Sequence, residues 1–193
     1  MKREQKQEEL YRTALTIFAE YGYKKTTIED IASAMGLAKG TLYLYAKNKL
    51  ELYRDTVAWA FNRWQNRVKE AVIQVSDPVE KLMVLSHSAY EYLSGDRAFR
   101  KILERDPDLF PLFESKDPFS DINMESVSMI KAILIEGAES GVLHVPDPEQ
   151  AARCLFSIYV MFIQKTYVVP EGEPVKSMFE TAINLLLRGL RAH

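Results

Sequence analysis

Apolar residues recur at spacings of three and four along most of the chain, which is the period of an amphipathic α-helix. No stretch of useful length alternates apolar and polar residues as a half-buried strand does. The pattern therefore predicts an all-α protein. The first helical stretch ends at Gly22, and its apolar positions are Leu10, Ala14, Ile17, Phe18 and Tyr21.

Two short helices are expected after this first one. Thr27 followed three residues later by Asp30 is a capping-box pattern that opens a helix, and Gly36 ends that helix. A further short helix begins near Ala38 and contains Leu42. Two short helices joined at a glycine, each with an apolar face, form a helix-turn-helix geometry. Short helix pairs also occur in all-α proteins that bind no DNA, so spacing alone leaves both interpretations open.

Longer helices are expected over the rest of the chain, which shows no internal repeat. Residues that cap helix N-termini mark three of their starts, at Asn48, Asp77 and Asp147. Residues 97–119 contain three prolines, which predicts short helical pieces with bends, and residues 168–174 (VVPEGEP) predict a turn. The expected longer helices cover residues 48–75, 78–93, 120–140, 148–168 and 175–190.

The composition is that of an ordinary globular protein, with 47% hydrophobic and 27% charged residues among 193. A single cysteine, Cys154, excludes an internal disulfide framework and is expected to be a buried, inert thiol. The charged N-terminus MKREQKQEEL lacks the apolar segment of a secretory signal. The longest apolar run, residues 154–163, is shorter than the ~20 residues that span a bilayer. We therefore expect a soluble cytoplasmic protein that does not insert into membranes.

The net charge of −2 is unevenly distributed along the chain. Residues 1–54 contain 10 Lys and Arg against 7 Asp and Glu, whereas the remaining residues carry a net charge of −5. A basic N-terminal part on an acidic body is compatible with a local phosphate-binding face.

The third short helix carries groups that bind phosphates and base edges. With Leu42 facing the core, the outward groups are those of Lys39, Thr41 and Tyr43. Gly40 allows a backbone to approach closely. Lys49 is expected in the first turn of the next helix, where its charge opposes the helix dipole, and a nearby DNA phosphate would offset that cost.

The segment from Thr26 to Tyr53, TTIEDIASAMGLAKGTLYLYAKNKLELY, resembles the N-terminal signature of the tetracycline-repressor (TetR) family of transcriptional regulators. The motifs T-x-x-D-I-A, G-x-x-K-G-T-L-Y and K-N-K follow one another at the family's spacing. The preceding segment TALTIFAEYGYKKTT also fits, whereas the rest of the chain matches only in its order of helices.

This resemblance implies that residues 38–45 form the recognition helix of a DNA-binding domain. It assigns phosphate contacts to Thr27, Tyr43, Tyr45 and Lys49. It places closest to base edges Lys39, Gly40, Thr41 and Leu44. Two positions depart from the family pattern: Ala46 replaces an aromatic residue, which loosens the expected packing, and Leu44 replaces a polar or aromatic reader, which favours contact with a thymine methyl group.

The resemblance also implies a helix-turn-helix DNA-binding domain at residues 1–47 and a larger helical domain for effector binding and dimerisation at residues 48–193. The last two helices are expected to meet a second copy in a four-helix interface. The interface residues expected there are Phe156, Tyr159, Phe179, Ile183 and Leu186. The same apolar residues would also serve as the core of a single helical bundle, and both roles can hold for different faces of one helix.

An effector pocket is expected in the larger domain, lined by Trp64, Met83, His87, Tyr90, Phe113 and Met124. Ring faces and thioethers with few charges predict a neutral or weakly acidic hydrophobic ligand. The alternative is that these residues fill a solid core.

Other functional classes receive less support from the sequence. The histidines and Cys154 lack metal-ligand spacing, and no nucleophile elbow, phosphate loop or dinucleotide fingerprint occurs, so we expect no enzyme, metal or cofactor. A helical lipid or small-molecule carrier that reuses this fold without binding DNA is the alternative. The resemblance implies a homodimeric, ligand-responsive repressor that binds double-stranded operator DNA at a palindromic site.

Overall fold

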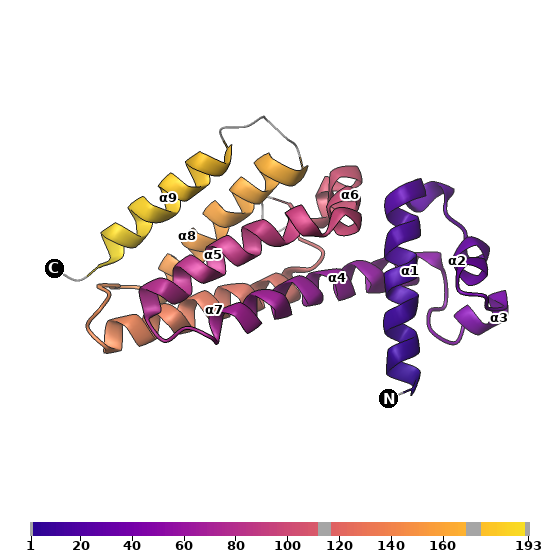
Figure 1. The fold of residues 1–193 in the computed structure, drawn as a ribbon, viewed down its shortest axis with the longest axis horizontal. Helices are drawn as coiled ribbons and strands as arrows, with labels where there is room; N and C mark the ends of the chain where they lie inside the picture. The colour runs from indigo at the N-terminus through magenta and orange to yellow at the C-terminus, as the bar shows by residue number, and fades with distance from the viewer. Residues whose placement is uncertain (1, 112–116, 169–174, 192–193) are drawn as a thin grey trace.

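The computed structural model describes residues 2–111, 117–168 and 175–191. Within these ranges the chain is helical, and its only β-type pairing is an isolated bridge between Leu143 and Arg191. The all-α prediction is therefore confirmed (Figure 1). No helix in the described ranges is both long enough and apolar enough to cross a membrane.

The three N-terminal helices, which we call the head, are α1 (Lys2–Lys25), α2 (Ile28–Ala34) and α3 (Lys39–Leu42). The expected break falls at Gly22, whose φ of 80° only glycine adopts without strain. The Thr27 hydroxyl accepts from the Asp30 amide, and the Asp30 carboxylate accepts from the Thr27 amide, so the predicted capping box is confirmed. Gly36, with a φ of 65°, ends α2 as expected. The third helix is a single turn that continues as hydrogen-bonded turns to Ala46.

The remaining helices form the body, and their starts follow the predicted caps. Asn48 and Asp77 accept hydrogen bonds from the amides of Glu51 and Glu80. The expected final helix is confirmed at Val175–Leu190, whereas the preceding helix ends as an α-helix at Ile163 and continues as a π-helical turn. The body elements are α4 (Lys49–Val72), α5 (Pro78–Gly95), α6 (Arg97–Arg105), η1 (Pro107–Leu109), α7 (Ser120–Glu139), α8 (Pro148–Ile163), η3 (Gln164–Val168) and α9 (Val175–Leu190). Of the predicted turn VVPEGEP, residues 169–174 lie outside the described residues.

Helix α4 belongs to the head at one end and to the body at the other. Figure 1 shows it running from α1 along the body, where α5 and α7 pack beside it. Near its start, Tyr53 packs on Phe18 and Tyr23 of α1, with ring centroids 5.0 Å from each. Two turns later Phe61 and Trp64 are buried in the body. The first turns of α4 therefore complete the head's core beyond the predicted boundary at residue 47, and the division at that residue stays a prediction.

Candidate DNA-reading surface and ligand cavity

The DNA-reading surface expected on the third helix rests on a buried leucine. Leu42 is 2% exposed and anchors α3 in the head. Ala46 is also buried, at 5% exposure, so the small side chain at this position is packed within the core. On the outer side Tyr43 is 47% exposed and Leu44 is 73% exposed. A Cβ atom at Gly40 would meet no other atom within 4 Å, so this glycine leaves an open surface.

The charged and polar groups of this surface are partly engaged within the head. The Lys39 ammonium pairs with the Glu29 carboxylate of α2, which raises the pKa of Lys39 and lowers that of Glu29. Thr27 is exposed and uses its hydroxyl oxygen as the cap of α2. Thr41 is half-buried, and Tyr45 is half-buried against the core.

Lys49 lies at the start of α4 and turns back toward the head. Its Nζ donates to the carbonyl oxygens of Tyr23 and Thr26 at 2.8 and 2.9 Å and lies 4.4 Å from the centre of the Tyr23 ring. These carbonyls follow the kink in α1, so the protein itself supplies partial negative charge that offsets a cation at a helix N-terminus. No DNA phosphate is needed for that purpose. A phosphate contact by Lys49 stays a prediction.

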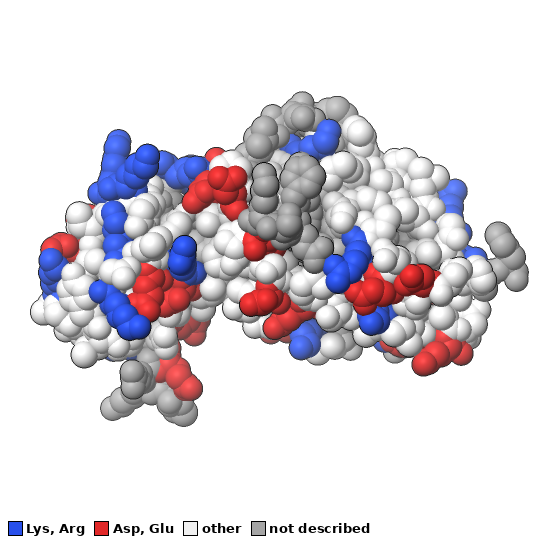
Figure 2. All heavy atoms as spheres, turned by 180° about the vertical axis from the view of Figure 1, so that it is seen from behind, with Lys and Arg blue, Asp and Glu red and all other residues white. Residues whose placement is uncertain are grey.

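Lysine and arginine are unevenly spread over the surface in Figure 2. Blue side chains are most frequent over the end of the molecule formed by α1–α3, with red ones among them, whereas the body shows both colours in smaller, separate areas. The basic excess of residues 1–54 therefore reaches the surface on this face of the head.

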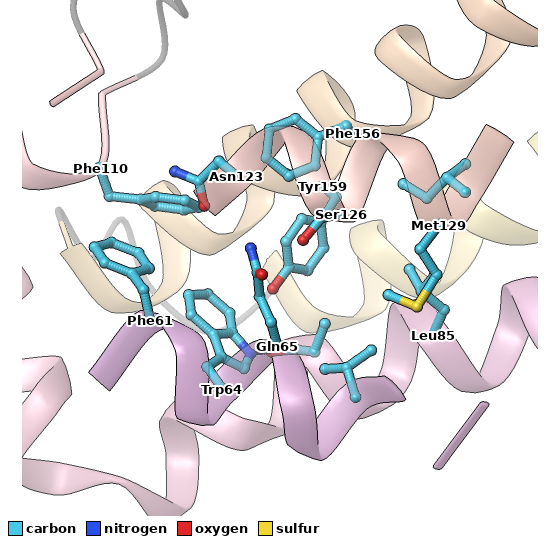
Figure 3. A pocket seen from close by; sticks show the side chains of 13 residues that line it. Phe61, Trp64, Gln65, Leu85, Phe110, Asn123, Ser126, Met129, Phe156 and Tyr159 are labelled. Carbon is cyan, nitrogen blue, oxygen red and sulfur yellow. Dashed lines mark hydrogen bonds between the residues drawn. The ribbon is translucent and has the colours of Figure 1, made fainter. Parts of the chain in front are cut away.

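A small cavity of about 30 Å³ lies in the body between α4, α5, α7 and α8. A second cavity, of about 60 Å³, adjoins it and shares the walls Phe110, Asn123 and Phe156. Figure 3 shows aromatic rings around one side of the first cavity and Leu85 with Met129 at the other. The side chains that line it are Phe61, Trp64, Gln65, Val68, Leu85, Ala89, Phe110, Asn123, Ser126, Met129, Ile130, Phe156 and Tyr159.

Most buried polar groups around this cavity have partners in the protein. The Trp64 indole N–H donates to the Ala89 carbonyl at 3.0 Å, and the Asn123 amide donates to Asp117 at 2.7 Å. Gln65 on α4 donates to the Ile122 carbonyl on α7 at 2.5 Å. Tyr159 differs, because its buried hydroxyl has no hydrogen-bond partner among the described residues. Burial raises the pKa of Tyr159 well above its usual range, so the hydroxyl stays protonated.

The predicted ligand residues do not all meet at this cavity. Trp64 lines it, and Met124 lines the adjoining one. Tyr90 instead stacks on Phe179 of α9 at a centroid distance of 4.5 Å, and His87 also faces that ring. Met83 is partly buried and lines neither cavity, and Phe113 lies outside the described residues.

His87 and Tyr90 do not line the cavity because of their angular positions on α5. Successive residues are turned by ~100° on a helix, so Leu85 and Ala89 face the cavity while His87 and Tyr90 face α9. On α4 the sequence pattern could have identified the cavity residues, because they share the spacing of one helical face. These residues are Phe61, Trp64, Gln65 and Val68.

The residues expected at a dimer interface stay a prediction, and most of them are already buried within a single chain. Phe156 and Tyr159 form walls of the cavity, and Phe179 and Ile183 are 1% and 4% exposed within a single chain. Side chains buried to this degree present little surface to a second copy. Leu186 is half-buried. The apolar residues that α9 does expose are Met178, at 52%, and Leu185, at 64%.

Cys154 also differs from the expectation, because it is exposed on α8 rather than buried. Within the described residues, no group of three histidine, cysteine, aspartate or glutamate side chains is arranged to hold a metal ion.

Comparison with known proteins assigns this architecture to a family. Residues 10–56 match the family described as "Bacterial regulatory proteins, tetR family". The HTH-type transcriptional repressor KstR2 of Mycolicibacterium smegmatis is 31% identical over 140 residues, which cover 70% of this chain and 66% of that protein. The fatty acid metabolism regulator protein of Bacillus subtilis is 25% identical over 92% of this chain and 91% of its own length.

Solved structures have the same fold. The transcriptional regulator FadR from Bacillus subtilis, in complex with stearoyl-CoA, superimposes with a TM-score of 0.74 at 22% identity, covering 94% of this chain and 98% of that one.

Proposed function

This chain belongs to the TetR family of bacterial transcriptional regulators, and from that premise we propose that it is a cytoplasmic repressor that binds a palindromic operator as a homodimer and is released by an apolar effector. The observation that carries the proposal is the exposed surface of α3 held over a buried Leu42. A carrier that bound no DNA would have no use for such a surface.

The head supplies both kinds of contact that a DNA-reading module needs. The exposed hydroxyl of Tyr43 and the ammonium of Lys39 are phosphate or base-edge donors. Leu44 offers an apolar side chain of the kind that contacts thymine methyl groups. The bare backbone at Gly40 permits close approach to the major groove.

Two heads are required for a palindromic site, since recognition helices of a dimer enter successive major grooves about 34 Å apart. The exposed Met178 and Leu185 of α9 support a dimer through this face. Helix α8 packs beside α9 and adds Ile158 and Met161, which are partly exposed. Paired against a second copy, these side chains would leave water.

Effector binding would reach the head through α4 and α6. Phe61 and Trp64 of the cavity contact Phe99 of α6 edge-on, with ring centroids 5.0 and 6.0 Å away. The other end of α6 touches the head, where Arg105 donates to the Glu20 carbonyl at 2.9 Å. A ligand that widens the cavity would favour a different spacing of the two heads, and DNA affinity would fall by the ligand's differential affinity for the two states.

The test is selection of duplex DNA from genomic fragments at low salt, followed by electrophoretic mobility shift with the selected site. We expect a palindromic site whose binding weakens steadily as salt rises. Recovery of no preferred sequence, with a folded protein, would contradict a role as a sequence-specific repressor.

A further inference from the structure

The Tyr159 hydroxyl is the unusual feature of the cavity. The side chain is 8% exposed, and Figure 3 shows its oxygen directed toward the side of the cavity where Gln65 and Trp64 lie. A buried hydroxyl without a hydrogen-bond partner is destabilising, because it has lost its hydration and gained nothing in exchange. Buried polar groups are nearly always paired, so a partnerless hydroxyl that faces a cavity suggests that its partner is a bound molecule.

The cavity walls restrict the charge of such a molecule. None of the residues that line the first cavity is Lys, Arg, His, Asp or Glu. An ionised carboxylate or amine would therefore lose its hydration without gaining a counter-ion, which is costly in an apolar site. A neutral oxygen, by contrast, needs only a hydrogen-bond donor, and the protonated Tyr159 hydroxyl is one.

A surface groove between α4 and α7, with a volume of about 560 Å³, adjoins the cavity. The two share Gln65, Ser126 and Met129 as a common wall. Gln65 spans the groove through its hydrogen bond to the Ile122 carbonyl, and Met129 has the flexible side chain that lets a wall adapt. Displacement of these side chains would connect the groove to the cavity.

The charges of the groove also select against a polyanion. Its charged residues are Lys69, Asp121 and Glu125, which together give a net charge of −1. A ligand that carries several phosphates would find one cation and two carboxylates at this opening. The groove therefore suits a neutral molecule better than a nucleotide-linked acyl group.

We propose that this cavity binds an uncharged, mainly apolar molecule with one acceptor oxygen, such as a ketone, lactone or ester, which enters between α4 and α7 and accepts a hydrogen bond from the Tyr159 hydroxyl. The proposal rests on the proposed function only in treating this molecule as the effector. A ligand of this kind is larger than the cavity of about 30 Å³, so binding requires a separation of the cavity walls, to which Phe110 and Phe156 belong. That separation of the walls would shift α4 and α6, and through them the position of the head.

Three probes of equal chain length test the recognition of oxygen: 2-nonanone, its isostere 2-methylnon-1-ene, and nonanoate. Calorimetry and tryptophan fluorescence of the full-length protein should show that 2-nonanone binds roughly tenfold more tightly than the alkene, the ratio expected for one buried hydrogen bond. Nonanoate should bind more weakly still. In Tyr159→Phe the ketone and the alkene should bind equally.

Tyr90→Phe is the matched control, because it removes a buried hydroxyl that lies outside the cavity and is bonded to Thr166 at 2.8 Å. It should keep the preference for the ketone and lower the melting temperature. Tyr159→Phe should keep or raise the melting temperature without ligand, since it removes an unpaired hydroxyl. A loss of stability in Tyr159→Phe comparable with that of Tyr90→Phe would show a structural partner and overturn the proposal.

The entrance is tested with Ser126→Phe, which fills the shared wall, and with Ser128→Phe, which lies in the groove but not in the cavity wall. Association of 2-nonanone should slow about tenfold or more in the first variant only. Equal rates in the two variants would contradict the proposed route.

The outcomes separate this inference from the proposed function. If the protein binds its operator but shows no difference between ketone and alkene, the Tyr159 subsite is wrong and the repressor assignment stands. If the ketone binds through Tyr159 but DNA affinity is unchanged, the subsite stands and effector-controlled release is wrong.

Discussion

Leu44 is 73% exposed, the largest exposure among the large hydrophobic side chains of the described residues. An isolated exposed leucine adds little to stability, so its neighbours on α3 suggest a role in reading DNA. We expect Leu44→Ala to weaken the preference for the correct base at one or two base pairs of the site. The loss of binding free energy at the affected position should be roughly 1–3 kcal/mol. Tyr43→Phe, the control, should weaken all sequences about equally. Competition binding across single-base variants of the site distinguishes the two, and identical sequence profiles for wild type and Leu44→Ala would exclude Leu44 as a reader.

Lys49 joins the start of α4 to the end of α1, and two of its three donors are already used there. Hydrogen bonds from a charged group contribute roughly 1.5–3 kcal/mol each. We therefore expect Lys49→Ala to lower the free energy of unfolding by about 2 kcal/mol, measured by urea denaturation. Exposed Lys47→Ala is the control and should change stability little. The salt dependence of DNA binding, measured on the same variants, reports whether either lysine also contacts a phosphate. Unchanged stability of Lys49→Ala would contradict the structural role.

At the scale of elements, α6 connects the cavity with the head. Arg105 at its end donates to the Glu20 carbonyl, and the neighbouring Asp106 accepts from the Tyr53 hydroxyl at 3.4 Å. We expect Arg105→Ala to bind an effector with unchanged affinity and to lose part of the effector's influence on DNA affinity, by roughly 1 kcal/mol or about fivefold. Calorimetry of the effector and mobility shift with and without it give the two quantities. Arg97→Ala, an exposed residue on the same helix, should match wild type. Full release of DNA by effector in Arg105→Ala would exclude this connection.

At the scale of the whole molecule, the proposed dimer would form through the exposed side chains of α9. We expect sedimentation of the wild-type protein to give about twice the chain mass of 22.2 kDa. The double variant Met178→Glu, Leu185→Glu should sediment as a folded monomer and bind the operator with reduced affinity. Ile73→Glu is the control, because Ile73 is 68% exposed at the end of α4, and it should stay dimeric. Ile183→Glu should unfold the protein instead, since it buries a charge. A wild-type monomer at micromolar concentration would contradict the dimer.

The sequence by itself determined the helices and most of their ends. The caps at Thr27, Asn48 and Asp77, and the break at Gly22, are where the pattern predicted them. These features depend on hydrogen bonds and backbone angles within a few residues, which a local pattern specifies. The burial of Leu42 and the exposure of Tyr43 follow from the same local periodicity.

The tertiary structure alone decided which face of each helix meets which neighbour. Tyr90 and Tyr159 are both buried tyrosines on apolar helices, yet the Tyr90 hydroxyl is bonded to Thr166, whereas the Tyr159 hydroxyl faces a cavity and has no partner among the described residues. Phe179 and Met178 are adjacent in sequence, yet one is core and the other is surface. The physical reason is that a helix turns each residue by ~100°, so a residue's environment is set by the packing of distant helices rather than by its own segment.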